Sequence, residues 1–163
     1  MRVFLGSDHA GFELKAHLLQ AVADAGHEPV DCGATGYEEQ DDYPPYCFEV
    51  GERTVADPGS LGVVIGGSGN GEQIAANKVP GVRAALAWNA ETARLAREHN
   101  DANVVSIGAR QHSIEEATEL VRLFLATPFS EDPRHVRRIG LVTDYERDRH
   151  RPAGGLPTRR VHP

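Results

Sequence analysis

Cysteine, aromatic residues and long apolar runs are scarce in this sequence. Only two of its 163 residues are cysteines, Cys32 and Cys47, and their number and spacing match neither a metal cluster nor a redox motif. No apolar run approaches the length of a membrane-spanning helix, and residues 1–5 predict a strand in place of a signal peptide. These absences indicate a reduced cytoplasmic protein without a membrane partner, in which both thiols pack against other side chains.

Positive charge is in deficit as well. The chain carries 24 acidic and 17 basic side chains, a net charge of −7 with histidine neutral, which disfavours nucleic acid as a partner. Aromatic residues make up 6% of the chain while glycine occurs 17 times, a composition that suits tightly packed strand and helix layers. At this length a single domain is expected.

What the sequence does contain is a glycine loop between a strand and a helix. Residues 61–65 are mainly apolar and rich in β-branched side chains, as in a strand buried on both faces. Four glycines occur within residues 66–71, and residues 72–76 are good helix formers. Such a loop aims backbone N–H groups at one point near the positive end of a helix dipole. It would hold a phosphate, a carboxylate or an enolate formed during a reaction.

Glu72 separates this loop from known phosphate-binding loops. A P-loop requires Lys and then Ser or Thr after its last glycine, and a dinucleotide loop requires Gly or Ala where Glu72 stands. A carboxylate here would repel a bound phosphate, but it suits a general base beside an oxyanion that forms when a proton leaves carbon. Acidic residues are also favoured in the first turn of a helix. From this segment alone, Glu72 is equally a base or a partner of the helix dipole.

Strand and helix patterns alternate along the chain. The predicted strands are residues 2–6, 28–31, 61–65, 83–87 and 104–107, and the predicted helices are residues 12–25, 46–55, 72–76, 91–99, 113–126 and 131–145. This alternation predicts an α/β fold with a mostly parallel five-stranded sheet and helices on both faces. Residues 38–43 form an acidic loop, which we interpret mainly as solvated surface with Tyr43 within reach of a site.

Several polar residues are expected at the carboxyl edge of this sheet, where α/β proteins bind ligands. Asp8 and His9 follow the first strand, the glycine loop follows the third, and Arg110 follows the fifth. Asp8 is also a suitable helix N-cap, and His9 is equally a solvated turn residue. His99 ends a helix, so the polarity of the fold places it at the opposite edge. It would join the same site only if a second subunit supplied it.

The C-terminal part of the chain is basic. Arg134 and Arg138 are four residues apart and share one helix face. Two guanidiniums placed in this way would grip one phosphate, and a solvated basic face is the alternative interpretation. Beyond this helix the chain loses its periodicity and gains Pro, Gly and Arg. We therefore divide the chain into a domain over residues 1–146 and a disordered tail over residues 147–163.

Three motifs, in this order, resemble those of the B-type ribose-5-phosphate isomerases, a family that also contains isomerases of six-carbon sugar phosphates. They are residues 6–11, the glycine loop with residues 74–78, and residues 98–103 with residues 108–110. The resemblance covers about residues 1–146. It implies a Rossmann-like parallel sheet and a homodimer with active sites built from both chains, and it leaves open whether dimers pair into tetramers. It also implies that ribose 5-phosphate and ribulose 5-phosphate interconvert through an enediolate, without a metal or a cofactor.

The same resemblance implies a role for each candidate residue. Asp8 and His9 resemble the substrate-binding pair, and His99 resembles the residue that helps to open the sugar ring. Asn100 and Arg110 resemble substrate contacts, while Arg134 and Arg138 resemble a phosphate clamp. Backbone N–H groups of the loop would bind the enediolate oxygens, with Ser68 moving a proton between them. The loop residues concerned are Gly67, Ser68, Gly69, Asn70 and Gly71.

The chain departs from the family pattern at the general base. Many members carry Cys as the base immediately before the Gly-Ser/Thr-Gly element, where this chain has Gly66, which cannot take a proton. A branch without that Cys carries Glu at the position that matches Glu72. The resemblance therefore implies that Glu72 takes the proton from the carbon beside the carbonyl and returns it to the neighbouring carbon.

Three other functions are compatible with parts of the sequence. An isomerase for a six-carbon sugar phosphate would use the same motifs, because these motifs do not determine the depth of the substrate pocket. A nucleotide-binding regulatory module on the same fold is disfavoured by Glu72 and by the missing loop lysine. A purely structural oligomeric domain would leave Asp8, His9, His99 and the two phased arginines unexplained.

Overall fold

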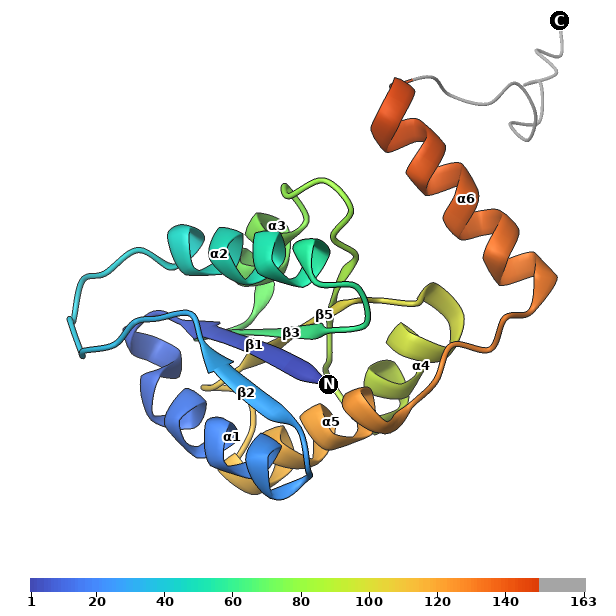
Figure 1. The fold of residues 1–163 in the computed structure, drawn as a ribbon. Helices are drawn as coiled ribbons and strands as arrows, with labels where there is room; N and C mark the ends of the chain where they lie inside the picture. The colour runs from blue at the N-terminus through green and yellow to red at the C-terminus, as the bar shows by residue number, and fades with distance from the viewer. Residues whose placement is uncertain (150–163) are drawn as a thin grey trace, which may run out of the picture.

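In a computed structural model that describes residues 1–149, the chain folds into one parallel sheet between two helix layers (Figure 1). The strands are β1 (Arg2–Ser7), β2 (Glu28–Asp31), β3 (Leu61–Gly66), β4 (Ala84–Leu86) and β5 (Val104–Gly108). The helices are η1 (His9–Gly11), a 3-10 turn, and α1 (Phe12–Asp24), α2 (Tyr43–Ala56), α3 (Asn70–Ala76), α4 (Ala90–Asn100), α5 (Ile114–Ala126) and α6 (Pro133–Asp148). The sheet order is β2-β1-β3-β5-β4, and every neighbouring pair is parallel. The predicted α/β fold is confirmed.

Alternating side chains of each strand feed two separate cores. Val63 and Ile65 of β3 belong to the core beneath α1, α4 and α5, whereas Val64 belongs to the core beneath α2 and α3. Figure 1 shows α2 and α3 on one side of the sheet and α1 and α5 on the other. Every residue of β3 is buried, because strands flank it on both edges and helices cover both of its faces. This double burial explains why its sequence is a continuous apolar run.

Both cysteines are free thiols of the second core. Cys47 is buried in it, and Cys32 packs against it. Burial raises the pKa of the Cys47 thiol to about 12 and that of the Cys32 thiol to about 11. Both side chains are therefore protonated packing groups near neutral pH.

The sheet order creates a topological switch point beside β1. The chain leaves β1 toward β2 on one side and later returns to place β3 on the other side of β1. At such a switch point the two crossover connections diverge, and open α/β sheets bind their ligands outside the carboxyl ends of the two strands. The segments that follow β1 and β3 are residues 8–11 and the glycine loop, so two of the three sequence motifs lie next to each other at this edge.

Helix α6 stands apart from the rest of the fold. In Figure 1 it leans away from the sheet and approaches the body near α4, and His135 is its only buried residue. Several of its apolar side chains are exposed, including Val136, Val142 and Tyr145. This amphipathic helix of 16 residues therefore leaves much of its apolar face exposed within residues 1–149.

Element boundaries differ slightly from those predicted. Helix α2 begins at Tyr43, one residue before the helix start that Pro44 and Pro45 predict, and the two prolines fit its first turn, where their missing N–H groups cost nothing. Helix α6 continues to Asp148, so residues 147 and 148 of the predicted tail are helical. Arg149 is the C-cap of this helix, and the remaining residues of the predicted tail, 150–163, lie outside the described residues. Within residues 1–149, no helix combines the length and the apolar character needed to span a bilayer.

Candidate active site

Asp8 and His9 lie directly beyond the carboxyl end of β1. Asp8 is 6% exposed, and its carboxylate accepts a hydrogen bond of 3.0 Å from the backbone N–H of Ala10. It therefore caps the η1 turn, as one of the two interpretations of the sequence predicted. His9 is part of that turn, and its side chain is only a quarter exposed, so it is not a freely solvated turn residue.

The Glu72 side chain is buried directly beneath Gly66. Glu72 is 4% exposed, and a Cβ atom built on Gly66 would overlap its carboxylate, with Oε1 the nearest atom and Oε2 at 2.8 Å. Only a glycine at position 66 leaves this volume free. The Glu72 carboxylate thus occupies the space that any side chain at position 66 would fill.

Burial makes the Glu72 carboxyl group a stronger base. Removal from water raises its pKa above the ordinary value of 4.5, and the nearby Asp8 carboxylate raises it further. The backbone N–H groups of Glu72 and Gly69 act in the opposite direction without cancelling the rise. A buried carboxylate with a raised pKa beside a loop of backbone N–H groups has the character of a general base.

The glycine loop is held in a defined shape. Gly69 has φ = 81°, a left-handed conformation that favours glycine, and it caps the first turn of α3. The buried Ser106 hydroxyl of β5 donates a 2.6 Å hydrogen bond to the Gly69 carbonyl. The exposed Ser68 hydroxyl oxygen lies 3.3 Å from both the backbone N and the side-chain Nδ2 of Asn70. These bonds fix the direction of the loop while leaving the Ser68 hydroxyl at the surface.

Two larger side chains lie against this loop. A Cβ atom on Gly67 would lie 3.3 Å from Nη1 of Arg110, and a Cβ atom on Gly71 would lie 2.7 Å from the hydroxyl oxygen of Tyr43. Tyr43 therefore reaches the loop, in line with its suggested access to a site. We call the group formed by Asp8, His9, Gly67, Ser68, Gly69, Asn70, Gly71, Glu72 and Arg110 the carboxyl-edge cluster; the sequence predicted that it would assemble.

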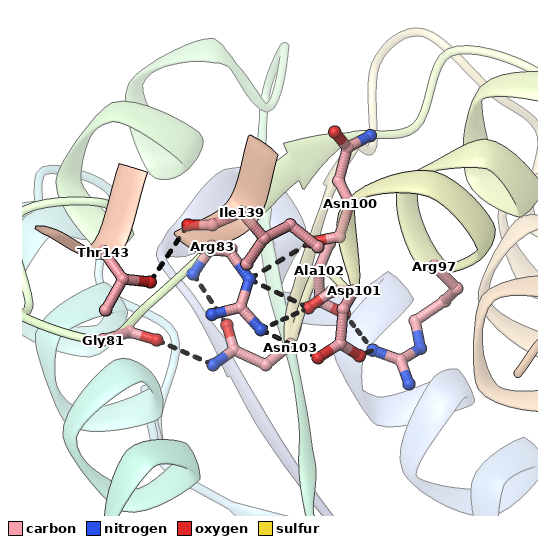
Figure 2. A network of polar contacts seen from close by, with 9 residues as sticks. All are labelled: Gly81, Arg83, Arg97, Asn100, Asp101, Ala102, Asn103, Ile139 and Thr143. Atoms are coloured by element: carbon pink, nitrogen blue, oxygen red, sulfur yellow. Dashed lines mark hydrogen bonds and ion pairs between the residues drawn. The ribbon is translucent and has the colours of Figure 1, made fainter. Parts of the chain in front are cut away.

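His99 and Asn100 lie at the other edge of the sheet. They end α4 beside the start of β4, where Arg83 Nε lies 3.1 Å from the Asn100 carbonyl oxygen (Figure 2). Arg83 Nη2 also bonds the carbonyl and the carboxylate of Asp101 at 2.8 and 2.9 Å, and Arg97 Nη1 bonds the same carboxylate at 2.8 Å. This network holds Asp101 in the left-handed conformation (φ = 43°) that ends the helix.

The two arginines of α6 belong to this second edge as well. Arg138 and Asn100 line one cavity of about 470 Å³ between α6 and the sheet. Arg134 is exposed and pairs with Asp132 at 3.4 Å. We call His99, Asn100, Arg134 and Arg138 the amino-edge cluster. Within residues 1–149, the candidate site is thus divided between opposite edges of one sheet.

His135 is an amino-edge residue that the sequence analysis missed. Its ring is buried and packs on the His99 ring with centroids 4.2 Å apart, and its Nδ1 lies 2.9 Å from the Ser130 hydroxyl. Burial and the adjacent His99 lower the pKa of His135, which keeps the ring neutral at neutral pH. Nothing in the pattern of α6 distinguishes His135, because its partner lies 36 residues earlier in the chain.

The acidic loop was wrongly interpreted as mainly solvated surface at one position, Asp41. The Asp41 side chain is 6% exposed, and its Oδ1 accepts hydrogen bonds from both the backbone N–H and the ring Nδ1 of His9, each at 2.8 Å. Burial opposes its ionisation, but the bonds from His9, together with the nearby Tyr46 hydroxyl and the charge of His9, outweigh burial, so the pKa of Asp41 is lowered. Nothing in the sequence distinguishes Asp41, whose side chain is shielded from water, from the exposed acids of the same loop.

Asp8, His9 and Asp41 also have the residue types of a metal site. One potential ligand atom from each lies within 4.8 Å of the others. The geometry of the described atoms is that of a hydrogen-bonded cluster, since His9 Nδ1 is already bonded to Asp41 and Asp8 already caps η1.

Known proteins resemble the whole described fold. The chain is 59% identical over 152 residues to the ribose-5-phosphate isomerase B of Mycolicibacterium paratuberculosis, covering 93% of this chain and 96% of that protein. It superposes with a TM-score of 0.86 on ribose-5-phosphate isomerase B from Mycoplasma genitalium with bound ribulose 5-phosphate, at 36% identity, covering 90% of this chain and 97% of the other. The type B enzyme from Trypanosoma cruzi gives a TM-score of 0.86 at 44% identity, covering 90% and 99%. The sequence profile named Ribose/Galactose Isomerase matches residues 3–142. The chain is therefore a member of the Ribose/Galactose Isomerase family.

Proposed function

We propose that this protein is an aldose–ketose isomerase that interconverts ribose 5-phosphate and ribulose 5-phosphate. The observation that carries the proposal is the buried Glu72 carboxylate, with its raised pKa, beside a loop of backbone N–H groups. The names of the relatives and the ribulose 5-phosphate bound to the Mycoplasma genitalium enzyme support this substrate. Such an enzyme would act in pentose phosphate metabolism in the cytoplasm.

In the proposed reaction, Glu72 moves one proton between two neighbouring carbons. The carboxylate takes the proton from C2 of the open-chain aldose, and the electron pair of the broken C–H bond forms the enediolate. Returning the proton to C1 gives the ketose, while the Ser68 hydroxyl moves a proton between the two oxygens. Loop N–H groups from Gly67 to Gly71 would stabilise the negative oxygen. A positioned base contributes about 10²–10⁴-fold, and each oxyanion donor about 10²–10³-fold.

The amino-edge cluster supplies the remaining functions in this proposal. His99 helps to open the sugar ring by moving a proton, Asn100 contacts the sugar, and the guanidiniums of Arg134 and Arg138 bind the phosphate. These residues lie across the sheet from Glu72, so one chain cannot bring both clusters to one substrate. We infer a homodimer in which the amino edge of one subunit faces the carboxyl edge of its partner. The exposed apolar face of α6 offers a surface for this contact.

The proposed activity is tested on two substrates. Turnover of ribose 5-phosphate and allose 6-phosphate is measured for the wild type and for Glu72→Gln, together with ribose 5-phosphate binding by calorimetry. We expect turnover of the pentose, a loss of at least about 100-fold in kcat in the variant, and binding that is largely retained. Near-normal turnover by Glu72→Gln would contradict the role of Glu72 as the base.

A six-carbon substrate is the alternative, because the family includes galactose in its description. Turnover of allose 6-phosphate alone would keep the mechanism and change the substrate. No turnover of either sugar phosphate, with thermal stabilisation only by ATP or NAD, would favour a nucleotide-binding module instead.

The shared site is tested by mixing two inactive variants. Glu72→Gln lacks the base at the carboxyl edge, and His99→Asn lacks the ring-opening group at the amino edge. In a homodimer with shared sites, random mixing makes half of the dimers mixed, each with one intact site, so about a quarter of wild-type activity returns. No recovery after subunit exchange would contradict the shared site.

A further inference from the structure

The loop between β2 and α2 carries a side chain that grips His9 at two points. Asp41 lies 32 residues after His9, and its Oδ1 accepts both the backbone N–H and the ring Nδ1 of His9 at 2.8 Å. The second carboxylate near the ring, that of Asp8, is 3.9 Å from Nδ1 and is engaged by the N–H of Ala10. Asp41, and not the adjacent Asp8, is therefore the partner of the ring.

This double contact fixes more than the position of a loop. The backbone bond sets the main chain of His9, and the ring bond sets the rotation of its side chain. The Asp41 side chain is 6% exposed and that of His9 is 25% exposed, so water does not compete strongly for either bond. The lowered pKa of Asp41 means that the carboxyl group is ionised and can only accept hydrogen bonds.

The chemistry of the pair then defines the state of the ring. Because an ionised carboxylate only accepts, Nδ1 must carry a proton. In the neutral ring the other nitrogen, Nε2, is then an unprotonated acceptor. Other proteins orient functional histidines in the same manner: a histidine that binds a metal through one ring nitrogen often donates its other ring N–H to a carboxylate.

From these contacts we infer that Asp41 is a positioning residue that holds His9 in the Nδ1–H tautomer and directs its Nε2 toward the substrate. The inference rests on the proposed function, in which His9 contacts the sugar phosphate. Asp41 itself touches no substrate atom in this role. Its removal should therefore alter the ring of His9 before it alters anything else in the site.

The experiment compares three variants of the full-length chain. Asp41→Ala removes both bonds. Asp41→Asn keeps an oxygen that can accept both, and the amide takes the place of Oδ2, which is buried without a hydrogen-bond partner among residues 1–149. Asp42→Ala is the matched control, since Asp42 is the adjacent exposed acid and its side chain makes no capping bond.

Two quantities are measured for each variant. The first is the tautomer of His9 from the ¹⁵N shifts of its ring nitrogens without substrate; the chain has eight histidines, so the signals are assigned by their loss in His9→Gln. The second is kcat/KM for ribose 5-phosphate. We expect Nδ1–H in the wild type, in Asp41→Asn and in Asp42→Ala, and a shift of the proton to Nε2 in Asp41→Ala. We expect kcat/KM to fall about 10–100-fold in Asp41→Ala, with losses below ~10-fold in the other two variants.

Three results would overturn the inference. They are an Nε2–H tautomer in the wild type, an unchanged tautomer or unchanged kcat/KM in Asp41→Ala, and an equal loss of activity in Asp42→Ala. If Asp41→Ala does not fold, the wild type and Asp41→Asn are compared instead: Nδ1–H is expected in both, and an Nε2–H tautomer in either would overturn the inference. The tautomer is read without substrate, so an inactive wild type would refute the proposed function and still leave the Asp41–His9 pair to be tested.

Discussion

Replacing Gly66 by alanine should damage catalysis by adding one methyl group to a residue that carries no reactive group. The Cβ atom would overlap the Glu72 carboxylate, and both residues are buried. Gly66 lies at the end of the central strand, where its backbone pairs with both β5 and the segment after it. The strand cannot move away, so the carboxylate must.

The size of the effect follows from this displacement. Relief of the overlap requires the nearest carboxylate oxygen to retreat by on the order of 1 Å, and a misplacement of that size costs about 100-fold in rate. Complete loss of the base would cost up to about 10⁴-fold. We therefore expect kcat of Gly66→Ala to fall about 10²–10⁴-fold, with an overpacking cost of about 1–3 kcal/mol in the free energy of unfolding.

The assay is steady-state turnover of ribose 5-phosphate, corrected for the folded fraction by thermal denaturation. Gly62→Ala is the matched control: it lies in the same strand, but its Cβ would press on Thr54 and Val50 at 2.8 Å, away from Glu72. The control should lose stability and keep kcat. The double variant Gly66→Ala with Glu72→Gln should be no slower than Glu72→Gln alone, because both changes remove the same function. A kcat for Gly66→Ala close to that of the wild type would refute this reasoning.

Three further predictions concern the charges and rings of the two clusters. Glu72→Gln should raise the free energy of unfolding at pH 7. The raised pKa means that the folded state holds the proton more tightly than the unfolded state, so ionised Glu72 destabilises the fold as pH rises through that pKa. Urea unfolding should therefore show a gain at pH 7 that disappears below pH 4.5. The acidic limb of kcat/KM should have its midpoint above 4.5, with activity lost as pH falls through the raised pKa of Glu72; a midpoint at or below the ordinary value would speak against Glu72 as the base. A double-mutant cycle between His99→Ala and His135→Ala should give a coupling energy of about 0.5–1.5 kcal/mol in unfolding, and a coupling near zero would mean that the ring contact does not stabilise α6.

The fold was predictable because its signals are local or periodic. Each buried strand is a short apolar run, and helices α2, α4, α5 and α6 begin with a capping side chain or a proline. The alternation of strands and helices leaves a parallel sheet as the simple solution. The carboxyl-edge cluster followed from the same logic, since residues after parallel strands must meet at one edge. The placement of His99 at the opposite edge also followed from helix polarity alone.

The residues that were missed depend on distant contacts. Asp41 is one acid among several in its loop, and only its bonds to a histidine 32 residues away distinguish it. His135 lies off the face shared by Arg134 and Arg138, and the His99 ring of α4 packs against it and helps to bury it. Neither spacing nor composition encodes such pairings. The sequence also contains no sign of how far α6 would stand away from the sheet.

The overlap at Gly66 has a consequence for how such enzymes change over generations. A side chain at position 66 and the Glu72 carboxylate would occupy the same space. A chain with a proton-carrying side chain at position 66 therefore has no room for a carboxylate from position 72 in this position. Position 66 must first be substituted by glycine. The resulting ancestor would have no proton-carrying side chain at position 66 and, until Glu appears at position 72, none there either. If Glu72 is the base, ancestors of that kind would be poorly selected, and chains with a base at position 66 would stay separate from chains with a base at position 72. Positions 66 and 72 are therefore expected to vary together among relatives, as one inherited unit rather than as two.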